Sequence, residues 1–253
     1  MLVLPPQDAG HWALALALNA LLITAASRLP LLTPAGWFHA GILGSVLWGA
    51  LGPAAWLSVV AYLALGSLVT RLGFRSKQAR GLAEARGGRR GPENVWGSAL
   101  VGALLALITP LAPTALRPAL LLAFAASFAA KLADTFGSEI GKRWGRHTVL
   151  ITNLQPVPPG TEGAVSLEGS AASLVGAALM ALVMLALGLV EGWRAWLLIS
   201  AVGLLATLAE SLLGATLQGR WPWLVNELVN GLQTLLAALL ALALAPLLGA
   251  SPA

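Results

Sequence analysis

The sequence predicts an all-α fold, a polytopic transmembrane helical bundle with about eight membrane-spanning helices. Of its 253 residues, 58% are hydrophobic and only 10% are charged, and the mean hydropathy is +0.82. Apolar segments of the length that crosses a bilayer, about 20 residues, recur along the chain. The alternation typical of strands is absent, which favours helices as the spanning elements. We therefore expect a single integral membrane domain, 1–253.

The expected spans follow one another with short connections, at 10–27, 36–51, 53–72, 94–111, 117–144, 168–190, 193–217 and 224–248. The second is short and interrupted by glycines, so a tilted or re-entrant segment is an alternative there. The first is not preceded by a positively charged region, so we expect it to be retained and not cleaved as a signal peptide. The sequence has no cysteine, which excludes disulfides, thiolate metal sites and cysteine nucleophiles.

The basic residues predict the orientation. With the N-terminus outside, twelve of the 15 lysines and arginines fall on the inner side: Arg28, Arg71, Arg75, Lys77, Arg80, Arg86, Arg89, Arg90, Lys142, Arg143, Arg146 and Arg220. Positive residues concentrate in cytoplasmic loops. We therefore expect an inner (plasma) membrane protein with both termini outside. A basic loop (73–93) and a loop rich in glycine and proline (145–167) would then be cytoplasmic. The net charge of +5 is thus a topology signal, and no nucleic-acid motif accompanies it.

The segment "KLADTFGSEIGK" places charges at the end of an apolar span. On a helix, Lys131 reaches Asp134 one turn on. One interpretation is a structural pair of these two residues, with Lys142 extending to the interface. The other is a divalent-cation site, in which Asp134 and Glu139 supply the oxygen ligands that Mg²⁺ takes and Lys131 contacts a phosphate. Because five positions separate the carboxylates, they would lie on either side of such a site, or one would act indirectly.

Two glycine patterns accompany this segment. Gly137 and Gly141 form a G-x-x-x-G, which predicts close helix packing, and the spacing and preceding helix exclude a Walker A loop. In "PPGTEGAVSLEGS", Gly160 and Gly163 free the backbone so that successive N–H groups can converge on an anion. Hydroxyl and carboxylate groups accompany them at Thr161, Glu162 and Ser166. The alternative is an ordinary turn with a helix cap at Ser166.

Further polar residues lie near the same membrane face. Glu210 is an acid inside the seventh span, and Asn226 and Asn230 share one face of the eighth. Arg89 and Arg90 precede the fourth span. Hydrogen bonding between helices is the alternative explanation for the amides. Together these groups describe a site for Mg²⁺ and phosphates. The three histidines are scattered, so zinc and a Ser-His-Asp set are not expected.

Four stretches, "AAKLADTFGSEIGK", "GTEGAVSLEGSAASLVGA", "ESLLGATLQ" and "LVNELVNGLQT", resemble the successive motifs of one integral membrane family. This is the domain of unknown function family 92, which includes the plant phytyl-phosphate kinases, and the resemblance covers roughly 35–234. It implies phosphoryl transfer from a nucleoside triphosphate to an isoprenoid monophosphate, giving the diphosphate. The family is distantly similar to CTP-dependent prenol and dolichol kinases, so CTP is the favoured donor and Mg²⁺ the expected cofactor.

The resemblance also implies roles for particular residues. The family's acidic motif, glycine loop and amides correspond here to Asp134, Ser138, Glu139, Gly160, Thr161, Glu162, Gly163, Ser166, Asn226 and Asn230. Two positions depart from the family pattern. Glu210 stands where Asp is common, and "ENVWGS" replaces the usual Gln-x-x-Ala-Asn. These departures leave a strict role at those positions open.

Two other functions stay open at this point. A cytidylyltransferase acting on a lipid phosphate would use the same groups but attack the α-phosphate. A lipid or ion transporter without enzymatic activity would be expected to show inverted repeats and polar residues at mid-bilayer, and neither is seen. The expected partners are an isoprenoid phosphate lipid and the membrane, with no nucleic acid; a homodimer is left open.

Overall fold

The computed structural model describes residues 3–218, 220–221 and 223–249, and most of these residues are helical. The α-helices are α1 Ala9–Ala26, α2 Pro34–Leu51, α3 Pro53–Arg71, α4 Phe74–Ala79, α5 Pro92–Ile108, α6 Arg117–Trp144, α7 Leu167–Ala186, α8 Trp193–Leu213 and α9 Asn226–Leu244. Short 3₁₀ turns are η1 Ala85–Gly88, η2 Thr109–Leu111, η3 Thr114–Leu116 and η5 Ala245–Leu248, and a π turn, η4, covers Gly214–Gln218. The strands β1 Val149–Leu150 and β2 Ala164–Val165 pair antiparallel, a small hairpin that the sequence did not predict.

Seven helices of the described chain are long and apolar enough to cross a membrane, which confirms the predicted polytopic bundle. Of the eight expected spans, the one outside this group is α2, which is nevertheless continuous over its 18 residues. It begins beside the start of α5, where Leu32 and Arg90 form a backbone bridge. It also contacts η2, which follows the far end of α5. Because α2 extends alongside α5 from one end of that helix to the other, it is neither short nor re-entrant in the described structure.

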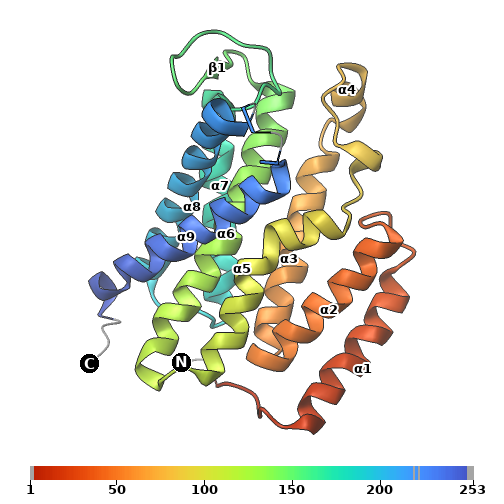
Figure 1. Cartoon of the computed structure of the whole chain (residues 1–253), viewed down its shortest axis with the longest axis vertical. Helices are drawn as coiled ribbons and strands as arrows, with labels where there is room; N and C mark the ends of the chain where they lie inside the picture. Colours follow the sequence, from red (N-terminus) through yellow and green to blue (C-terminus); the bar gives the residue numbers. More distant parts are fainter. Residues whose placement is uncertain (1–2, 219, 222, 250–253) are drawn as a thin grey trace.

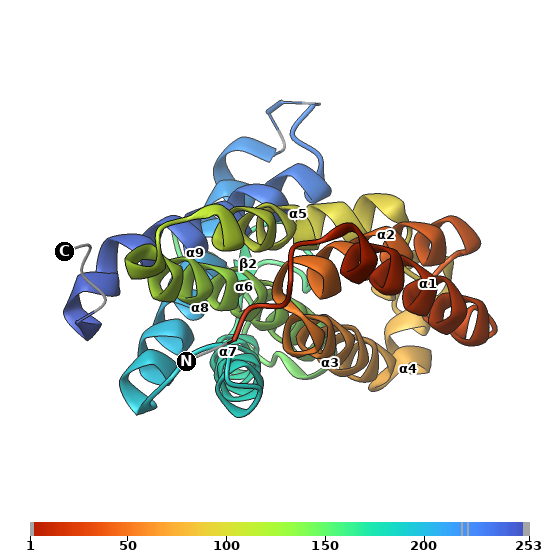
Figure 2. The same cartoon turned by 90° about the horizontal axis from the view of Figure 1, so that it is seen from below.

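The centre of the bundle is α6, which α3, α5, α7, α8 and α9 surround (Figure 2). Small residues let these neighbours approach closely. A side chain at Gly203 of α8 would lie 3.2 Å from the backbone of Ala129. A Cβ at Gly137 would lie 2.1 Å from Ser173 Oγ of α7, and Gly141 faces the same helix. The prediction of close packing at this G-x-x-x-G is therefore confirmed.

The two ends of the bundle differ in charge. One end carries α4 and β1, and α1 begins at the other (Figure 1). The twelve basic residues expected inside lie in the connections α1–α2, α3–α5, α6–α7 and α8–α9, or in the last turns of α3 and α6 that lead into them, and these parts lie at the first end. Arg117 and Arg194 begin α6 and α8 at the second end. The basic end is the cytoplasmic one in our prediction of the topology.

Candidate active site

A polar cavity of about 530 Å³ opens at the basic end of the bundle. It lies between α3, α5, α6, α7, α8 and α9, and the two predicted loops complete its wall. Every site residue predicted from the sequence lines it: Arg89, Arg90, Lys131, Asp134, Ser138, Glu139, Lys142, Gly160, Thr161, Glu162, Gly163, Ser166, Glu210, Asn226 and Asn230. The fold thus brings together groups that are up to 141 positions apart, from Arg89 to Asn230.

The deep part of the cavity is organised by Lys131. Its ammonium group forms an ion pair with Asp134, one turn on, and donates a hydrogen bond to Asn230 Oδ1 of α9 at 2.8 Å. The predicted contact between Lys131 and Asp134 is present. Because a buried ammonium group needs partners, this pair and the Asn230 amide fix the cation where α6 meets α9.

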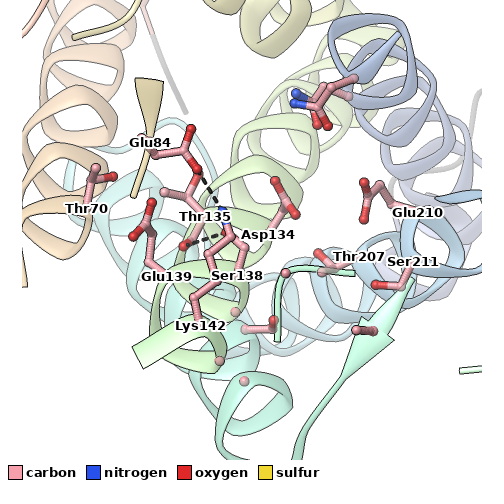
Figure 3. A pocket seen from close by; sticks show the side chains of 18 of the residues that line it. Thr70, Glu84, Asp134, Thr135, Ser138, Glu139, Lys142, Thr207, Glu210 and Ser211 are labelled. Atoms are coloured by element: carbon pink, nitrogen blue, oxygen red, sulfur yellow. Dashed lines mark hydrogen bonds and ion pairs between the residues drawn. The ribbon is translucent and has the colours of Figure 1, made fainter. Parts of the chain in front are cut away.

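Three carboxylates from different elements approach one another above Lys131. Asp134 of α6 and Glu210 of α8 lie across from each other in Figure 3. Glu162 comes from the hairpin loop. Burial raises the pKa of Glu162; the charge of Lys142 lowers it, and the charge of Asp134 raises it further. A cation bound here would offset both the cost of burying charged carboxylates and the repulsion between them.

Glu139 contacts a different neighbour from the one expected. It forms an ion pair with Lys77 of α4, whose side chain is fully buried and also donates to Thr70 O at 2.9 Å. In Figure 3, Glu139 lies toward Thr70, away from Glu210. The structure therefore does not place Glu139 opposite Asp134 around a common cation. No local pattern in the sequence could have indicated the Lys77 contact, because 62 positions separate the partners.

The rim of the cavity is held by the basic loop. Lys142 donates to Glu84 Oε1 at 2.8 Å, and Arg80 donates to the Lys142 carbonyl at 3.1 Å. Burial acts to raise the pKa of Glu84, but the charge and hydrogen bond of Lys142, with smaller effects of Lys131 and Arg90, bring that pKa below its usual value. Glu84 thus remains a carboxylate that partly neutralises the Lys142 charge. Sequence reasoning missed Glu84, which sits in a loop interpreted mainly through its positive charge.

The glycine loop forms the opposite wall. Gly160 and Gly163 adopt positive φ angles of 87° and 73°, which glycine adopts without strain. A Cβ at Gly163 would lie 2.3 Å from Ala215 Cβ and 2.6 Å from Ser211 O, so the loop rests directly on the end of α8. Ser166 caps α7 by accepting a hydrogen bond from Gly169 N at 3.1 Å. The helix cap that the sequence offers as the alternative is present, while an anion bound by the loop remains a prediction.

The remaining lining residues include several that the sequence did not point to. Polar groups of this kind are Tyr62, Thr70, Arg86, Thr148, Ser170, Ser173, Thr207 and Glu227. Tyr62 and Thr70 lie on α3, whose sequence is mostly apolar. A helical repeat would have shown that Tyr62, Gly66 and Thr70 share one face. Asn226 and Arg89 are exposed at the rim, whereas Asn230 is buried.

The carboxylates that line the cavity suit a divalent cation only when a phosphate-bearing substrate supplies further oxygen atoms to it. The described residues contain no group of three His, Cys, Asp or Glu side chains that could hold a metal ion. Mg²⁺ commonly takes one or two carboxylates and completes its shell with phosphates and water. Asp134 and Glu210 offer hard oxygen atoms of that kind beside lysine cations. The donor set therefore fits Mg²⁺ bound with phosphates.

The fold and the cavity define an integral membrane protein of several spans, with a charged site at one end of its helices. The chain belongs to the family described as integral membrane protein DUF92, whose model matches residues 17–238. An uncharacterized membrane protein of Synechocystis is 48% identical over 233 residues, which cover 91% of this chain and 90% of the relative.

A second relative is Protein VTE6, chloroplastic, of Arabidopsis thaliana, which is 37% identical over 91% of this chain and 71% of its own length. An uncharacterized membrane protein of Methanocaldococcus jannaschii is 31% identical over 81% of this chain and 82% of the relative. No solved structure matches the chain. The shared family spans a bacterium, a plant and an archaeon.

Proposed function

We propose that this protein is a membrane-embedded kinase that transfers the γ-phosphoryl group of a nucleoside triphosphate, with CTP favoured, to an isoprenoid monophosphate. The observation that supports it most is the gathering of lysine, arginine, carboxylate and amide groups in one cavity at the end of membrane-crossing helices. The resemblance to plant phytyl-phosphate kinases supports the phytyl or polyprenyl nature of the acceptor.

The cations along α6 suggest how two phosphorylated substrates share the cavity. Lys131 and Lys142 are eleven positions apart, about 16 Å along the helix axis. Lys142, at the rim beside the glycine loop, is placed to meet nucleotide phosphates arriving from the aqueous side. Lys131, deep among the helices, is placed to meet a phosphate whose isoprenoid tail lies in hydrocarbon. In this proposal each lysine serves one of the two substrates.

Asp134, with Glu210 beside it, would hold Mg²⁺. When bound, Mg²⁺ would neutralise negative charge on the phosphates, and phosphoryl transfer requires this neutralisation. Glu139 acts differently in this proposal, because its carboxylate binds Lys77 and thereby fixes the basic loop over the site. A pairing of Glu139 with Asp134 as metal ligands, as the sequence predicts, would require Glu139 to leave Lys77.

In the proposed reaction, an oxygen of the lipid monophosphate attacks the γ-phosphorus, and the bond to the β–γ bridging oxygen breaks. The products are the lipid diphosphate and the nucleoside diphosphate. Because the attacking group is already an anion, no strong general base is required. Lys131 orients that anion, and Lys142 and the backbone N–H groups near Gly163 stabilise charge on the nucleotide. No histidine lines the cavity among the residues that the structure describes, which fits this chemistry.

The test is a transfer assay with the purified protein in detergent and Mg²⁺. ATP, CTP, GTP and UTP, each labelled at the γ-phosphate, are offered with phytyl, geranylgeranyl and undecaprenyl monophosphates, and the lipids are separated. We expect label in a lipid diphosphate, with CTP giving the highest rate. If no lipid is labelled, the assay is repeated with CTP labelled at the α-phosphate, and label in the lipid would then establish cytidylyl transfer. Lipid binding without any transfer by folded protein would contradict the kinase and favour a transporter.

A further inference from the structure

Tyr62 is the only tyrosine in the chain. It lies in the middle of α3, is 5% exposed and lines the cavity. Its hydroxyl group is buried and makes no hydrogen bond within the described part of the chain. A buried hydroxyl without a partner costs free energy, so such a group calls for a specific explanation. Its position on the cavity wall points to a ligand atom as the missing partner.

A guanidinium group stands next to this tyrosine. Arg90 Cζ lies over the Tyr62 ring, 5.2 Å from the ring centroid. Gly66, one turn along α3, leaves the room that this arrangement needs, because a Cβ there would lie 2.5 Å from Arg90 Nη2. Among the described residues, the Arg90 side chain donates no hydrogen bond and forms no ion pair within 4.0 Å, so its contact with the Tyr62 ring leaves its N–H groups without a partner. Its N–H donors are therefore available to a ligand.

A third donor reaches the same region from α6. The Lys131 ammonium group lines the same cavity as Tyr62 and Arg90. Lys131 is held by Asn230 and Asp134, so its position does not depend on a ligand. Tyr62, Arg90 and Lys131 thus bring a hydroxyl, a guanidinium and an ammonium group together from three separate elements. A phosphate monoester, with its charge and several acceptor oxygens, matches this set.

We propose that Tyr62 and Arg90 form, with Lys131, the subsite for the monophosphate of the lipid acceptor; this inference rests on the proposed function and assigns its second substrate. Tyr62 lies nine positions before the end of α3, about 13 Å along the helix axis. A phosphate at that depth keeps its isoprenoid tail among apolar helices. Nucleotide phosphates stay at the rim with Lys142. Tyr62 is therefore a residue that selects the acceptor.

Because the chain has one tyrosine, 3-fluorotyrosine incorporation gives a protein with a single ¹⁹F resonance at this site. The purified full chain in detergent is titrated with phytyl monophosphate, with phytol and with CTP. We expect the resonance to shift with phytyl monophosphate and to stay in place with phytol, which lacks the phosphate. CTP alone should leave it unchanged. Tyr62→Phe, which removes the signal, confirms the assignment.

Kinetics give a second readout. Tyr62→Phe should raise the KM for phytyl monophosphate about tenfold, the effect of losing one hydrogen bond to a charged group, and leave the KM for CTP unchanged. The thermal midpoint should not fall, because the removed hydroxyl has no protein partner among the described residues. The matched control is Ser58→Ala, one turn earlier on α3, whose hydroxyl already bonds to Ala55 O at 2.7 Å. It should leave both KM values unchanged.

The outcomes separate this inference from the proposed function. A resonance that responds to CTP and not to phytyl monophosphate would overturn the subsite, as would a Tyr62→Phe enzyme with wild-type KM for both substrates. If no donor supports transfer and phytyl monophosphate still shifts the resonance, the kinase assignment fails and the lipid phosphate subsite stands.

Discussion

At the scale of single residues, Asp134 is the carboxylate that the proposed chemistry needs most. It contacts Lys131 and faces Glu210, so it links a phosphate-binding cation to the proposed Mg²⁺ position. Asp134→Asn keeps a side-chain oxygen for Lys131 but removes the charge. We expect kcat/KM for transfer to fall at least about a hundredfold. The Mg²⁺ concentration for half-maximal rate should also rise.

The control for Asp134 is Asp8→Asn, at the opposite end of the molecule, where Asp8 caps α1 by accepting a hydrogen bond from His11 N. It should retain the wild-type rate and the wild-type Mg²⁺ dependence. A folded Asp134→Asn protein with unchanged rate and Mg²⁺ dependence would remove Asp134 from the metal site.

Lys77 tests whether the contact with Glu139 is structural. Lys77→Met leaves the Glu139 carboxylate buried without its cation, which should destabilise the fold by about 3–5 kcal/mol. The double variant Lys77→Met/Glu139→Gln removes the stranded charge and should recover most of that loss. Unfolding of the wild type, Lys77→Met, Glu139→Gln and the double variant in the same detergent measures the coupling. Additive losses in the double variant would show that the pair does not act as a unit.

At the scale of elements, we expect the glycine loop to bind phosphates only while it rests on the end of α8. Gly163→Ala should prevent this, because its Cβ would overlap Ala215 and Ser211 and its φ angle is +73°. We expect a transfer rate at least about tenfold lower, since a misplaced binding loop impairs substrate positioning. The bundle should stay folded, because the loop lies outside the packed helices.

Gly188→Ala is the matched control for this loop, because Gly188 also has a positive φ angle, +70°, but a Cβ added there would meet no described atom within 4 Å. It carries the same backbone strain without the overlap. Equal activity losses in Gly163→Ala and Gly188→Ala would attribute the effect to strain and not to loop docking.

The elements also show what sequence reasoning could achieve. Hydropathy and length predicted the spans, because each helix must satisfy its own backbone in hydrocarbon. Acids and amides are rare near apolar spans and therefore informative, so the sequence indicates many of the polar residues now found around the cavity. Tyr62 and Lys77 lie outside the set of residues that the sequence predicts for the site. A tyrosine is common within an apolar span, so Tyr62 does not stand out in the sequence. The partner of Lys77 depends on how α4 packs on α6, which the sequence does not show.

At the scale of the whole molecule, the bundle has one basic end that holds the cavity, and its orientation in the membrane is testable. The chain has no cysteine, so a thiol reagent labels only a cysteine that is introduced by substitution. Gln78→Cys marks the cavity end and Thr114→Cys the opposite end, and both positions are exposed. A membrane-impermeant maleimide should label Thr114→Cys in intact cells and Gln78→Cys only in inside-out vesicles. The reverse pattern would place the cavity outside the cell.

The central claim is that one cavity transfers a γ-phosphoryl group between a soluble nucleotide and a lipid phosphate. The most direct test supplies CTP labelled in parallel at the α- or the γ-phosphate, with phytyl monophosphate and Mg²⁺, to wild-type protein and to Asp134→Asn. We predict γ-label in phytyl diphosphate, no α-label in any lipid, and loss of product in Asp134→Asn. Incorporation of α-label with release of pyrophosphate would contradict the account, because the bond broken would then be at the α-phosphate.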